Sequence, residues 1–235
     1  VQGGGVDLTL RIEALRDKLR FAQTRRATVN RGAVDRIRTE AKRLRAAAPK
    51  AEAKGLTTAE MAALAYPDRI GLRRKGDAPR YQLSGGKGAV MDDSDALAGA
   101  RLIVATDLDG TPRDARIRQA IQITESALRT LFADQIAWVN LCDWSKRDRR
   151  VVARQQEKFA AIALDDRVWK DVPSDAVALA MLDGVRELGL APAMTDAARR
   201  FIARVALGRD AGQDLPDMSD ATLLETLPDW LLPHL

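Results

Sequence analysis

Two carboxylates, two positions apart, are the side chains of this sequence best suited to chemistry. Asp107 and Asp109 follow an apolar run in the stretch RLIVATDLDGT at residues 101–111. An aspartate can act as a nucleophile, as a general acid or base, and as a ligand of a divalent cation. Gly110 allows a structural interpretation as well, because Asp-Gly between two strands is a strong signal of a type I′ hairpin turn.

The stretch also resembles the first motif of the haloacid dehalogenase-type phosphatases. In that family the first aspartate is the nucleophile that takes the phosphoryl group, and the second is the general acid and base. A magnesium ion neutralises the charge between them. The resemblance therefore implies a magnesium-dependent phosphatase that uses Asp107 and Asp109.

The elements that would have to position these aspartates differ from those of that family. The family has a doubly wound α/β sheet, with a Ser or Thr, a Lys and a later acidic pair at the ends of successive parallel strands. Here apolar and polar residues alternate with a period of two in ARIRQAIQI at 115–123, which predicts a continuing β-strand. The stretch LDD at 164–166 and Lys170 could supply the remaining groups, but no βαβ pattern carries them. We therefore favour the hairpin turn and keep the phosphatase as the alternative function.

Composition limits the class of protein. The chain has 235 residues, of which 46% are hydrophobic, enough to build cores in one to three domains. The single cysteine, Cys142, excludes an internal disulfide framework, and with one histidine the chain has no plausible zinc site of its own. No apolar run approaches the roughly 20 residues that span a membrane, and the first residues show no signal-peptide pattern. We assign no catalytic residue and expect a cytoplasmic protein.

Charge divides the sequence into three zones. Residues 1–54 hold 14 Lys and Arg against 6 Asp and Glu, residues 55–172 hold 19 against 17, and residues 173–235 hold 5 against 10. A basic N-terminal zone attracts polyanions such as nucleic acid. Solvated helices with charged outer faces would give the same composition, so charge alone leaves both interpretations open.

The spacing of apolar residues changes near the same boundaries. Two stretches before residue 50 place apolar residues at steps of three and four, which predicts amphipathic helices. A third helix should begin with Thr57 and Glu60 as a capping box and should end near Pro67. We therefore expect a helical segment over residues 1–66.

Residues 67–172 are predicted to be mainly β-structure. Short candidate strands follow one another between turns such as GDAP, GGKG, DGTP and SKRDRR, which favours a small antiparallel barrel or sandwich. The stretch VVARQQEKFAAIAL at 151–164 is expected to be one strand, and one helix beginning at Thr124 interrupts the series. Trp138 and Trp144 share one face of a strand, which predicts that both lie in the core.

The last zone, residues 173–235, is predicted to be helical again. The expected N-caps and stop glycines are Ser174, Thr195, Ser219, Gly189 and Gly208. The predicted fold class is therefore α+β, with a helical segment, a β-domain and a small helical module in that order.

A second resemblance covers most of the chain. Strings in matching order, among them ALAYPDRIGLRRKGDAPRYQLSGGKGAVM, RVVARQQEKFAAIAL and ATLLETLPDWLLPHL, are similar to the C-terminal half of HrpB-type bacterial ATP-dependent RNA helicases of the DEAH class. The similarity runs from about residue 57 to residue 235. It implies the end of a helical bundle at residues 1–66, an OB-like β-barrel at 67–172, and part of a C-terminal extension at 173–235.

The sequence lacks the motor of such a helicase. It contains no Gly-x-x-x-x-Gly-Lys-Ser/Thr loop and no Asp-Glu-Ala-His element. The resemblance therefore implies a fragment of a longer protein, in which ATP and magnesium bind to the motor domains of the parent and not to this chain. The partners would be those motor domains and single-stranded RNA, and the role would be a non-catalytic grip and gate on the RNA.

The resemblance also points to an RNA-contacting surface in the β-domain. Holding single-stranded RNA needs positive charge and one or two aromatic faces on which bases stack. The residues that fit by type and position are Arg73, Arg74, Lys75, Arg80, Tyr81 and Lys87. Each also has a structural interpretation: Tyr81 as a core aromatic, Lys87 as a plain turn residue, and the run at 73–75 as a solvated strand edge.

Overall fold

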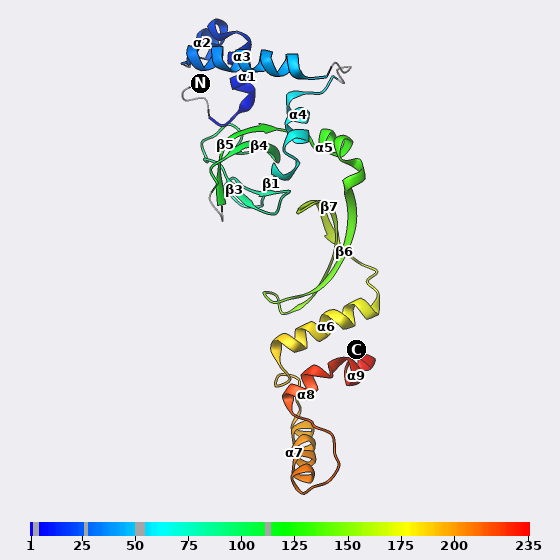
Figure 1. The fold of residues 1–235 in the computed structure, drawn as a ribbon. Helices are drawn as coiled ribbons and strands as arrows, with labels where there is room; N and C mark the ends of the chain where they lie inside the picture. The colour runs from blue at the N-terminus through cyan, green and yellow to red at the C-terminus, as the bar shows by residue number, and fades with distance from the viewer. Residues whose placement is uncertain (2–4, 26–27, 50–54, 111–113) are drawn as a thin grey trace. The chain divides into compact units, whose positions relative to one another are not determined.

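The chain folds into two compact units in this computed structural model, which describes residues 1, 5–25, 28–49, 55–110 and 114–235 (Figure 1). Unit 1 comprises Val1–Ala137 and Glu157–Leu164. Unit 2 comprises Trp138–Gln156 and Asp165–Leu235. Three strands supply residues to both units, so the boundary is not a single cut in the sequence. The expected division into 1–66, 67–172 and 173–235 stays a prediction.

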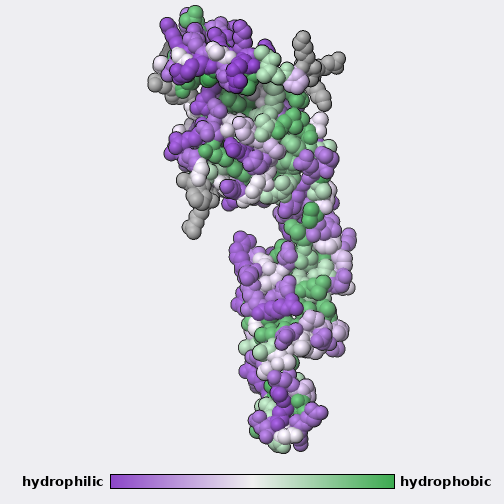
Figure 2. All heavy atoms as spheres, viewed as in Figure 1, coloured by the Kyte–Doolittle hydropathy of each residue, from purple (hydrophilic) through white to green (hydrophobic). Residues whose placement is uncertain are grey.

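The N-terminal part of unit 1 is helical. Its helices are α1 (Leu8–Arg16), α2 (Lys18–Arg25), α3 (Arg31–Ala47) and α4 (Thr58–Ala65). The predicted capping box opens α4: the Thr57 side chain accepts from the Glu60 N–H, and the Glu60 carboxylate accepts from the Thr57 N–H. The helix ends ahead of Pro67, as predicted, and the 3-10 helix η1 (Pro67–Arg69) follows. The face of α1–α3 seen in Figure 2 is mostly hydrophilic, in keeping with the basic composition of this zone.

Strands of unit 1 close into a barrel. They are β1 (Ile70–Arg73), β2 (Arg80–Leu83), β3 (Gly88–Val90), β4 (Leu102–Leu108) and β5 (Asp114–Gln122), in the order β1-β2-β3-β5-β4 around the barrel. β3 and β5 pair in parallel, and the other four pairings are antiparallel. An odd number of strands cannot alternate in direction around a closed ring, so one pairing has to be parallel. The predicted small barrel is confirmed, and its wholly antiparallel character is corrected at this pairing.

Alternating residues of the strands fill the barrel. In β5, Ala115 and Ile117 are buried while Arg116 and Arg118 are exposed, as the period of two predicts. The buried cluster around them consists of Tyr81, Leu83, Ala89, Met91, Leu97, Ala100, Ile103, Ile117 and Ala120. The inward face of the strands therefore forms a continuous core.

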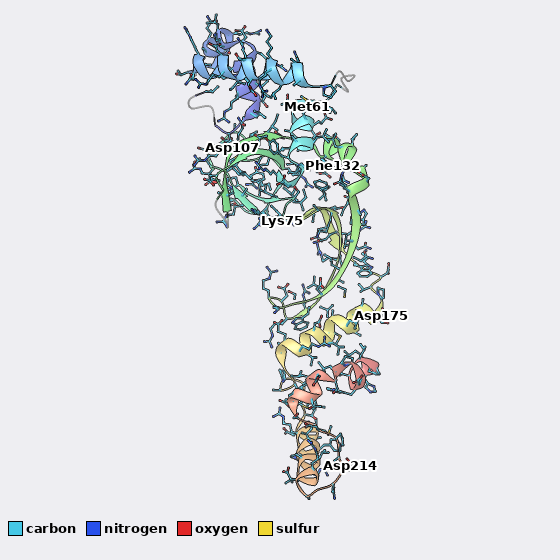
Figure 3. All side chains as sticks on the ribbon, viewed as in Figure 1. Met61, Lys75, Asp107, Phe132, Asp175 and Asp214 are labelled. Carbon is cyan, nitrogen blue, oxygen red and sulfur yellow. The ribbon has the colours of Figure 1, made fainter. Side chains whose placement is uncertain are left out.

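A helix packs in a second buried cluster, which joins Leu128, Phe132 and Phe159 to residues of β1, β4 and β5. This helix, α5 (Glu125–Leu131), begins after Thr124, which caps it as predicted, and the 3-10 helix η2 (Ala133–Gln135) follows it. Phe132, labelled in Figure 3, packs against Phe159 with ring centres 4.8 Å apart. Arg129 donates to the carboxylates of Glu125 and Glu157, and its hydrogen bonds lower the pKa of the Glu157 carboxyl. These contacts tie α5 to the end of a later strand.

A separate three-stranded sheet follows. Its strands are β6 (Ile136–Ser145), β7 (Arg150–Phe159) and β8 (Ile162–Val168), in that order across the sheet. The sequence predicts one strand over 151–164, and this prediction is wrong because the chain turns back between β7 and β8. Ala160 holds the turn with a positive φ of 49°. No Gly, Pro, Asn or Asp marks this turn in the sequence, so the usual signals of a turn are missing.

Unit 2 ends in helices. They are α6 (Ser174–Leu188), α7 (Asp196–Asp210), α8 (Asp220–Glu225) and α9 (Leu227–Trp230), followed by the 3-10 helix η3 (Leu232–His234). Thr195 and Ser219 cap α7 and α8 as predicted, and Gly189 ends α6 with a φ of 74°. Two predictions are wrong, since Ser174 is already inside α6 and Gly208 lies inside α7. Among the described residues, none of the helices has the length and apolar character needed to cross a membrane.

The two tryptophans of β6 have different environments. Trp144 lies against α6, where a Cβ added to Gly184 would come within 2.6 Å of its ring. Trp138 is 44% exposed, so the prediction that both lie in the core is wrong for Trp138. Residues an even number of positions apart share one face of a strand, and α6 covers this face at Trp144 while Trp138 stays exposed.

Candidate nucleic-acid interface

Asp107 and Asp109 belong to the β4–β5 hairpin. Asp107 lies at a β-bulge, because the register with β5 shifts on both sides of it, and its side chain is exposed (Figure 3). Asp109 Oδ1 accepts a hydrogen bond of 2.7 Å from the Arg116 N–H, and Asp109 Oδ2 lies 3.5 Å from Arg118 Nη2. Both contacts join the two strands of the hairpin, so Asp109 stabilises their pairing.

The hairpin differs from the predicted type I′ turn. That turn needs a positive φ at both central residues. Gly110 has a φ of 44°, but Asp109 is not among the described residues with a positive φ. The connection runs over residues 109–113, of which Thr111, Pro112 and Arg113 lie outside the described residues. Because β4 ends at Leu108 and β5 begins at Asp114, more than two residues join the strands.

The fold does not support the phosphatase alternative. The aspartates lie on a closed barrel, whereas that chemistry needs groups gathered at the ends of successive parallel strands. The stretch at 164–166 belongs to the separate three-stranded sheet. Within the described ranges, no three His, Cys, Asp or Glu side chains gather in a way that could hold a metal ion.

Arg73, the last residue of β1, uses its guanidinium within the protein. Its Nε donates to the Ala98 carbonyl at 2.9 Å. Its Nη1 and Nη2 donate to the carbonyls of Gly76 and Asp77 at 3.2 and 3.0 Å. Arg73 therefore ties the β1–β2 turn to the segment before β4, and these donors do not serve a ligand.

Tyr81 lies inside the barrel, with 0% of its surface exposed. Its hydroxyl lies 3.0 Å from the carbonyl oxygens of both Leu97 and Ala100, either of which can accept its proton. Burial raises the pKa of this phenol above its usual value. The core interpretation of Tyr81 fits this position, and the ring has no exposed face on which a base could stack.

Arg74, Lys75 and Arg80 are the predicted cations that reach the surface at one end of the β1–β2 hairpin. All three are exposed, and Figure 3 labels Lys75. The Arg74 N–H donates to the Arg80 carbonyl at 2.7 Å, which closes the hairpin. The Arg74 guanidinium donates to the side-chain oxygen of Gln82, which shares the outer face of β2 with Arg80.

The outer face continues onto β5, where sequence reasoning missed two arginines. Val90 of β3 pairs with Arg80 on one side and with Arg116 on the other. Arg116 and Arg118 are exposed, and each lies 3.5 Å from an aspartate oxygen. The alternation at 115–123 marks both arginines as outward-facing, but only the pairing of β2, β3 and β5 aligns Arg116 with Arg80.

Lys87 lies at the opposite end of β2, in the turn to β3. It is exposed, and the preceding Gly86 has a φ of 89°, a conformation that favours glycine. A hollow of about 420 Å³ lies beside this turn, and Arg69 and Lys87 are part of its lining. Arg69, whose guanidinium lies 5.0 Å from the centre of the Tyr66 ring, is a further cation that sequence reasoning missed.

The structure thus sorts the predicted residues by their surroundings. Arg73 and Tyr81 hold the barrel together, and the others are exposed. Because β2 has only four residues, Arg80 and Lys87 are separated by a distance on the order of 10 Å, which one strand of nucleic acid can bridge. We call the exposed cations of β2, β5 and the turns at the two ends of β2 the barrel face; they are Arg74, Lys75, Arg80, Lys87, Arg116 and Arg118.

Comparisons with known proteins point to an RNA helicase. No family model matches the chain. In sequence, the chain is 29% identical over 189 residues to the ATP-dependent RNA helicase HrpB of Escherichia coli (strain K12). This match covers 78% of the chain and 23% of that protein.

A solved structure agrees with the sequence match. The chain is similar to the crystal structure of the E. coli DExH-box NTPase HrpB, with a TM-score of 0.50 and 27% identity, over 100% of this chain and 28% of that one. A crystal structure of the Escherichia coli DEAH/RHA helicase HrpB gives a TM-score of 0.48 at 24% identity. The chain spans only about a quarter of the length of these relatives. The predicted resemblance is therefore confirmed: this chain is similar in sequence and structure to part of an HrpB-type RNA helicase, consistent with a C-terminal region.

Proposed function

We propose that this chain is a non-catalytic accessory region of an ATP-dependent RNA helicase and contacts single-stranded RNA through the barrel face. The observation that carries the proposal is the set of exposed cations on adjacent strands of one barrel, with Arg80 and Arg116 aligned through Val90. In the parent protein this contact would grip the RNA and help to gate its passage.

The topology of the barrel supports this role. We assign the barrel to the OB-like class, because its five strands follow the order β1-β2-β3-β5-β4 and β3 lies parallel to β5. OB-folds are five-stranded Greek-key barrels that bind oligonucleotides on the face of strands 2 and 3 and on the loops that join strands 1–2 and 4–5. Arg80 lies on β2, and Lys75 lies in the β1–β2 loop.

The chemistry of the barrel face favours the phosphate backbone over the bases. Its members are arginines and lysines, which displace counterions when they bind phosphates, so affinity should fall steeply with salt. Tyr81 is buried, and the barrel face as defined contains no aromatic ring. Binding through it should therefore depend little on base sequence.

The chemical step belongs elsewhere in this proposal. ATP and magnesium would bind to the motor domains of the parent, which are the second partner that we propose, and the setting would be the cytoplasm. The isolated chain should hydrolyse neither ATP nor a phosphomonoester in the presence of magnesium. A phosphatase activity that disappeared in Asp107→Asn would contradict this assignment.

Variants of the barrel face test the proposal. The whole chain is titrated against a labelled oligouridine of about 15 nucleotides, close to the upper site size of an OB-fold, and binding is followed by fluorescence anisotropy. Arg80→Ala and Lys87→Ala should each weaken binding and reduce the slope of log affinity against log salt by about 0.7. Arg204→Ala, on the exposed surface of α7, removes the same charge and should change neither quantity. Equal losses in all three variants would mean that binding follows net charge alone, and would contradict the proposal.

A further inference from the structure

A stacked pair of side chains lies on the three-stranded sheet, within unit 2. The Arg167 guanidinium, on β8, lies 4.1 Å from the centre of the Trp138 ring, on β6. Both side chains are exposed. The pair therefore presents a flat, positively charged surface to solvent.

Neutral side chains hold the arginine in place. Arg167 Nε donates to Gln155 Oε1 at 3.1 Å, and Gln155 Nε2 donates to Asn140 Oδ1 at 3.0 Å. These bonds run from β8 through β7 to β6, so all three strands orient the guanidinium plane. Because the residues that orient it are amides, they fix its direction without cancelling its charge. Such a plane suits a ligand that combines a flat ring with negative charge.

The neighbouring part of the same sheet face is packed. Cys142 and Trp144 share this face of β6 with Trp138. The Cys142 Sγ lies 3.5 Å from the carbonyl oxygen of Ala176, in α6, and Gly184 of α6 lies against Trp144. The helix therefore covers one end of the face, and the stacked pair lies on the open remainder.

Positive charge gathers at the end of this sheet. The β6–β7 turn and its two flanking strand residues have the sequence SKRDRR at residues 145–150, with four cations and one aspartate. Residues 146–150 are all exposed. Arg147 and Ser145 hydrogen-bond to Asp148 and lower the pKa of its carboxyl, so the aspartate is engaged within the turn. The turn keeps a net positive charge, which attracts phosphates.

We infer that this sheet is a second binding surface for single-stranded RNA, on which one base stacks against the outer plane of Arg167. Unpaired bases are held in this way by aromatic rings and by arginine planes. Trp138 supports the guanidinium from below. The cationic β6–β7 turn lies beyond the end of the face that α6 covers, on the order of 20 Å along β6 from Trp138, so an RNA of several nucleotides is needed to reach both. The choice of RNA as the polymer rests on the proposed function, but this surface belongs to unit 2 and shares no residue with the barrel face.

The decisive variant keeps the positive charge at position 167 and removes the planar guanidinium group. Arg167→Lys should weaken binding of the whole chain to the same labelled oligouridine by about five-fold or more, because stacking on the plane is lost. The dependence on salt should stay unchanged, because the charge is kept. Arg154→Lys is the matched control, since Arg154 is adjacent to Gln155 on β7 and points to the opposite face of the sheet. It should bind as the wild type does.

Two more variants separate stacking from charge. Trp138→Leu should weaken binding to a similar extent as Arg167→Lys, because the guanidinium loses its support. Arg150→Gln should instead reduce the salt slope by about 0.7 through the loss of one phosphate contact. Thermal melts followed by circular dichroism check the fold of every variant. If Trp138→Leu does not fold, Arg167→Lys with its control decides the question alone.

The outcomes distinguish this surface from the barrel face. Unchanged affinity in Arg167→Lys together with a loss in Arg80→Ala would overturn this inference and leave the proposed function intact. A loss in Arg167→Lys together with unchanged binding in Arg80→Ala would support this inference and contradict the barrel proposal. Wild-type chain that binds no oligouridine even at low salt would overturn both.

Discussion

The barrel and the three-stranded sheet each place an arginine near an aromatic ring, with opposite results. In the barrel, Arg73 and Tyr81 are directly paired residues of neighbouring strands, Tyr81 is 0% exposed, and Arg73 binds three backbone carbonyls. In the sheet, Arg167 stacks on Trp138, which is 44% exposed. The first pair holds the fold together, and the second is available to a ligand.

Closure of the sheet explains the difference. Every strand of a barrel has two neighbours, and its inner face is enclosed on all sides, so an inward-facing aromatic is buried by the topology itself. A sheet of three strands has two open faces and needs another element to cover them. Here α6 covers Trp144 but leaves Trp138 exposed. Variants of the two aromatic pairs should therefore differ in kind: inward-facing residues of the barrel should affect stability, and residues on the open part of the sheet should affect binding.

Tyr81→Ala should have the largest effect on stability. It removes a fully buried aromatic side chain and the hydroxyl that binds carbonyls before β4, so the free energy of unfolding should fall by about 3–5 kcal/mol. Urea denaturation followed by circular dichroism measures the loss. A loss below about 1 kcal/mol would show that the barrel interior does not depend on this ring, and the contrast between the regions would weaken.

Gly184→Val tests the covered end of the sheet. A side chain at this position would meet the Trp144 ring at 2.6 Å, so α6 should be displaced from the sheet at a cost of about 1–3 kcal/mol. Tryptophan fluorescence during denaturation would report the change in the surroundings of the ring. Gly208→Val places the same β-branched residue in α7, another helix of unit 2. It is a partial control for the general cost of such a residue, because a Cβ at Gly208 would also come within 2.6 Å of the Leu215 side chain.

Acid should weaken unit 1 through Glu157. Hydrogen bonds from Arg129 hold the pKa of Glu157 below its usual 4.5, so this stabilisation is complete above about pH 4.5 and is lost as the pH falls through the lower folded value. The side chain is 14% exposed, and the contribution should be on the order of 1 kcal/mol. Glu157→Gln should therefore flatten the pH dependence of urea denaturation below pH 4.5. A pH profile that is the same in the variant and the wild type would assign the acid sensitivity to other groups.

Trp138→Ala should have the smallest effect on stability. Its ring is 44% exposed and its contact to Arg167 is at the surface, so the free energy of unfolding should change by no more than about 1 kcal/mol. Equal losses of unfolding free energy in Trp138→Ala and Tyr81→Ala would mean that the open sheet depends on its aromatic residue as much as the barrel does. This result would contradict the contrast between the two regions.

The local parts of the fold were predictable because the interacting residues are close together in the sequence. Helix caps such as Thr57, Thr124 and Thr195 act on N–H groups within three residues, so a short window of sequence contains both partners. The turn at Ala160 was missed because the strained residue there has no Gly, Pro or Asn to mark it. The exposure of Trp138 was missed because the period of a strand shows which residues share a face, and does not show where a helix covers that face.

The candidate site was predictable in its residue types and less so in their arrangement. Charge and position identified Arg80 and Lys87, which are exposed. Arg73 had the same type and neighbourhood, but its partner Ala98 lies 25 positions away in the sequence, beyond any local pattern. Arg116 joins Arg80 only through the parallel pairing of β3 and β5, which is a property of the closed barrel.

Protection of lysines by RNA shows directly whether the barrel face contacts the RNA, because it reports where the RNA lies. The whole chain is acetylated with and without the labelled oligouridine, and the modified lysines are quantified by mass spectrometry. Lys75 and Lys87 lie on the barrel face, and Lys42, exposed on α3 in the basic N-terminal zone, serves as the control. We expect RNA to protect Lys75 and Lys87 and to leave Lys42 reactive. Unchanged acetylation of Lys75 and Lys87 under conditions where the RNA is bound would contradict this prediction.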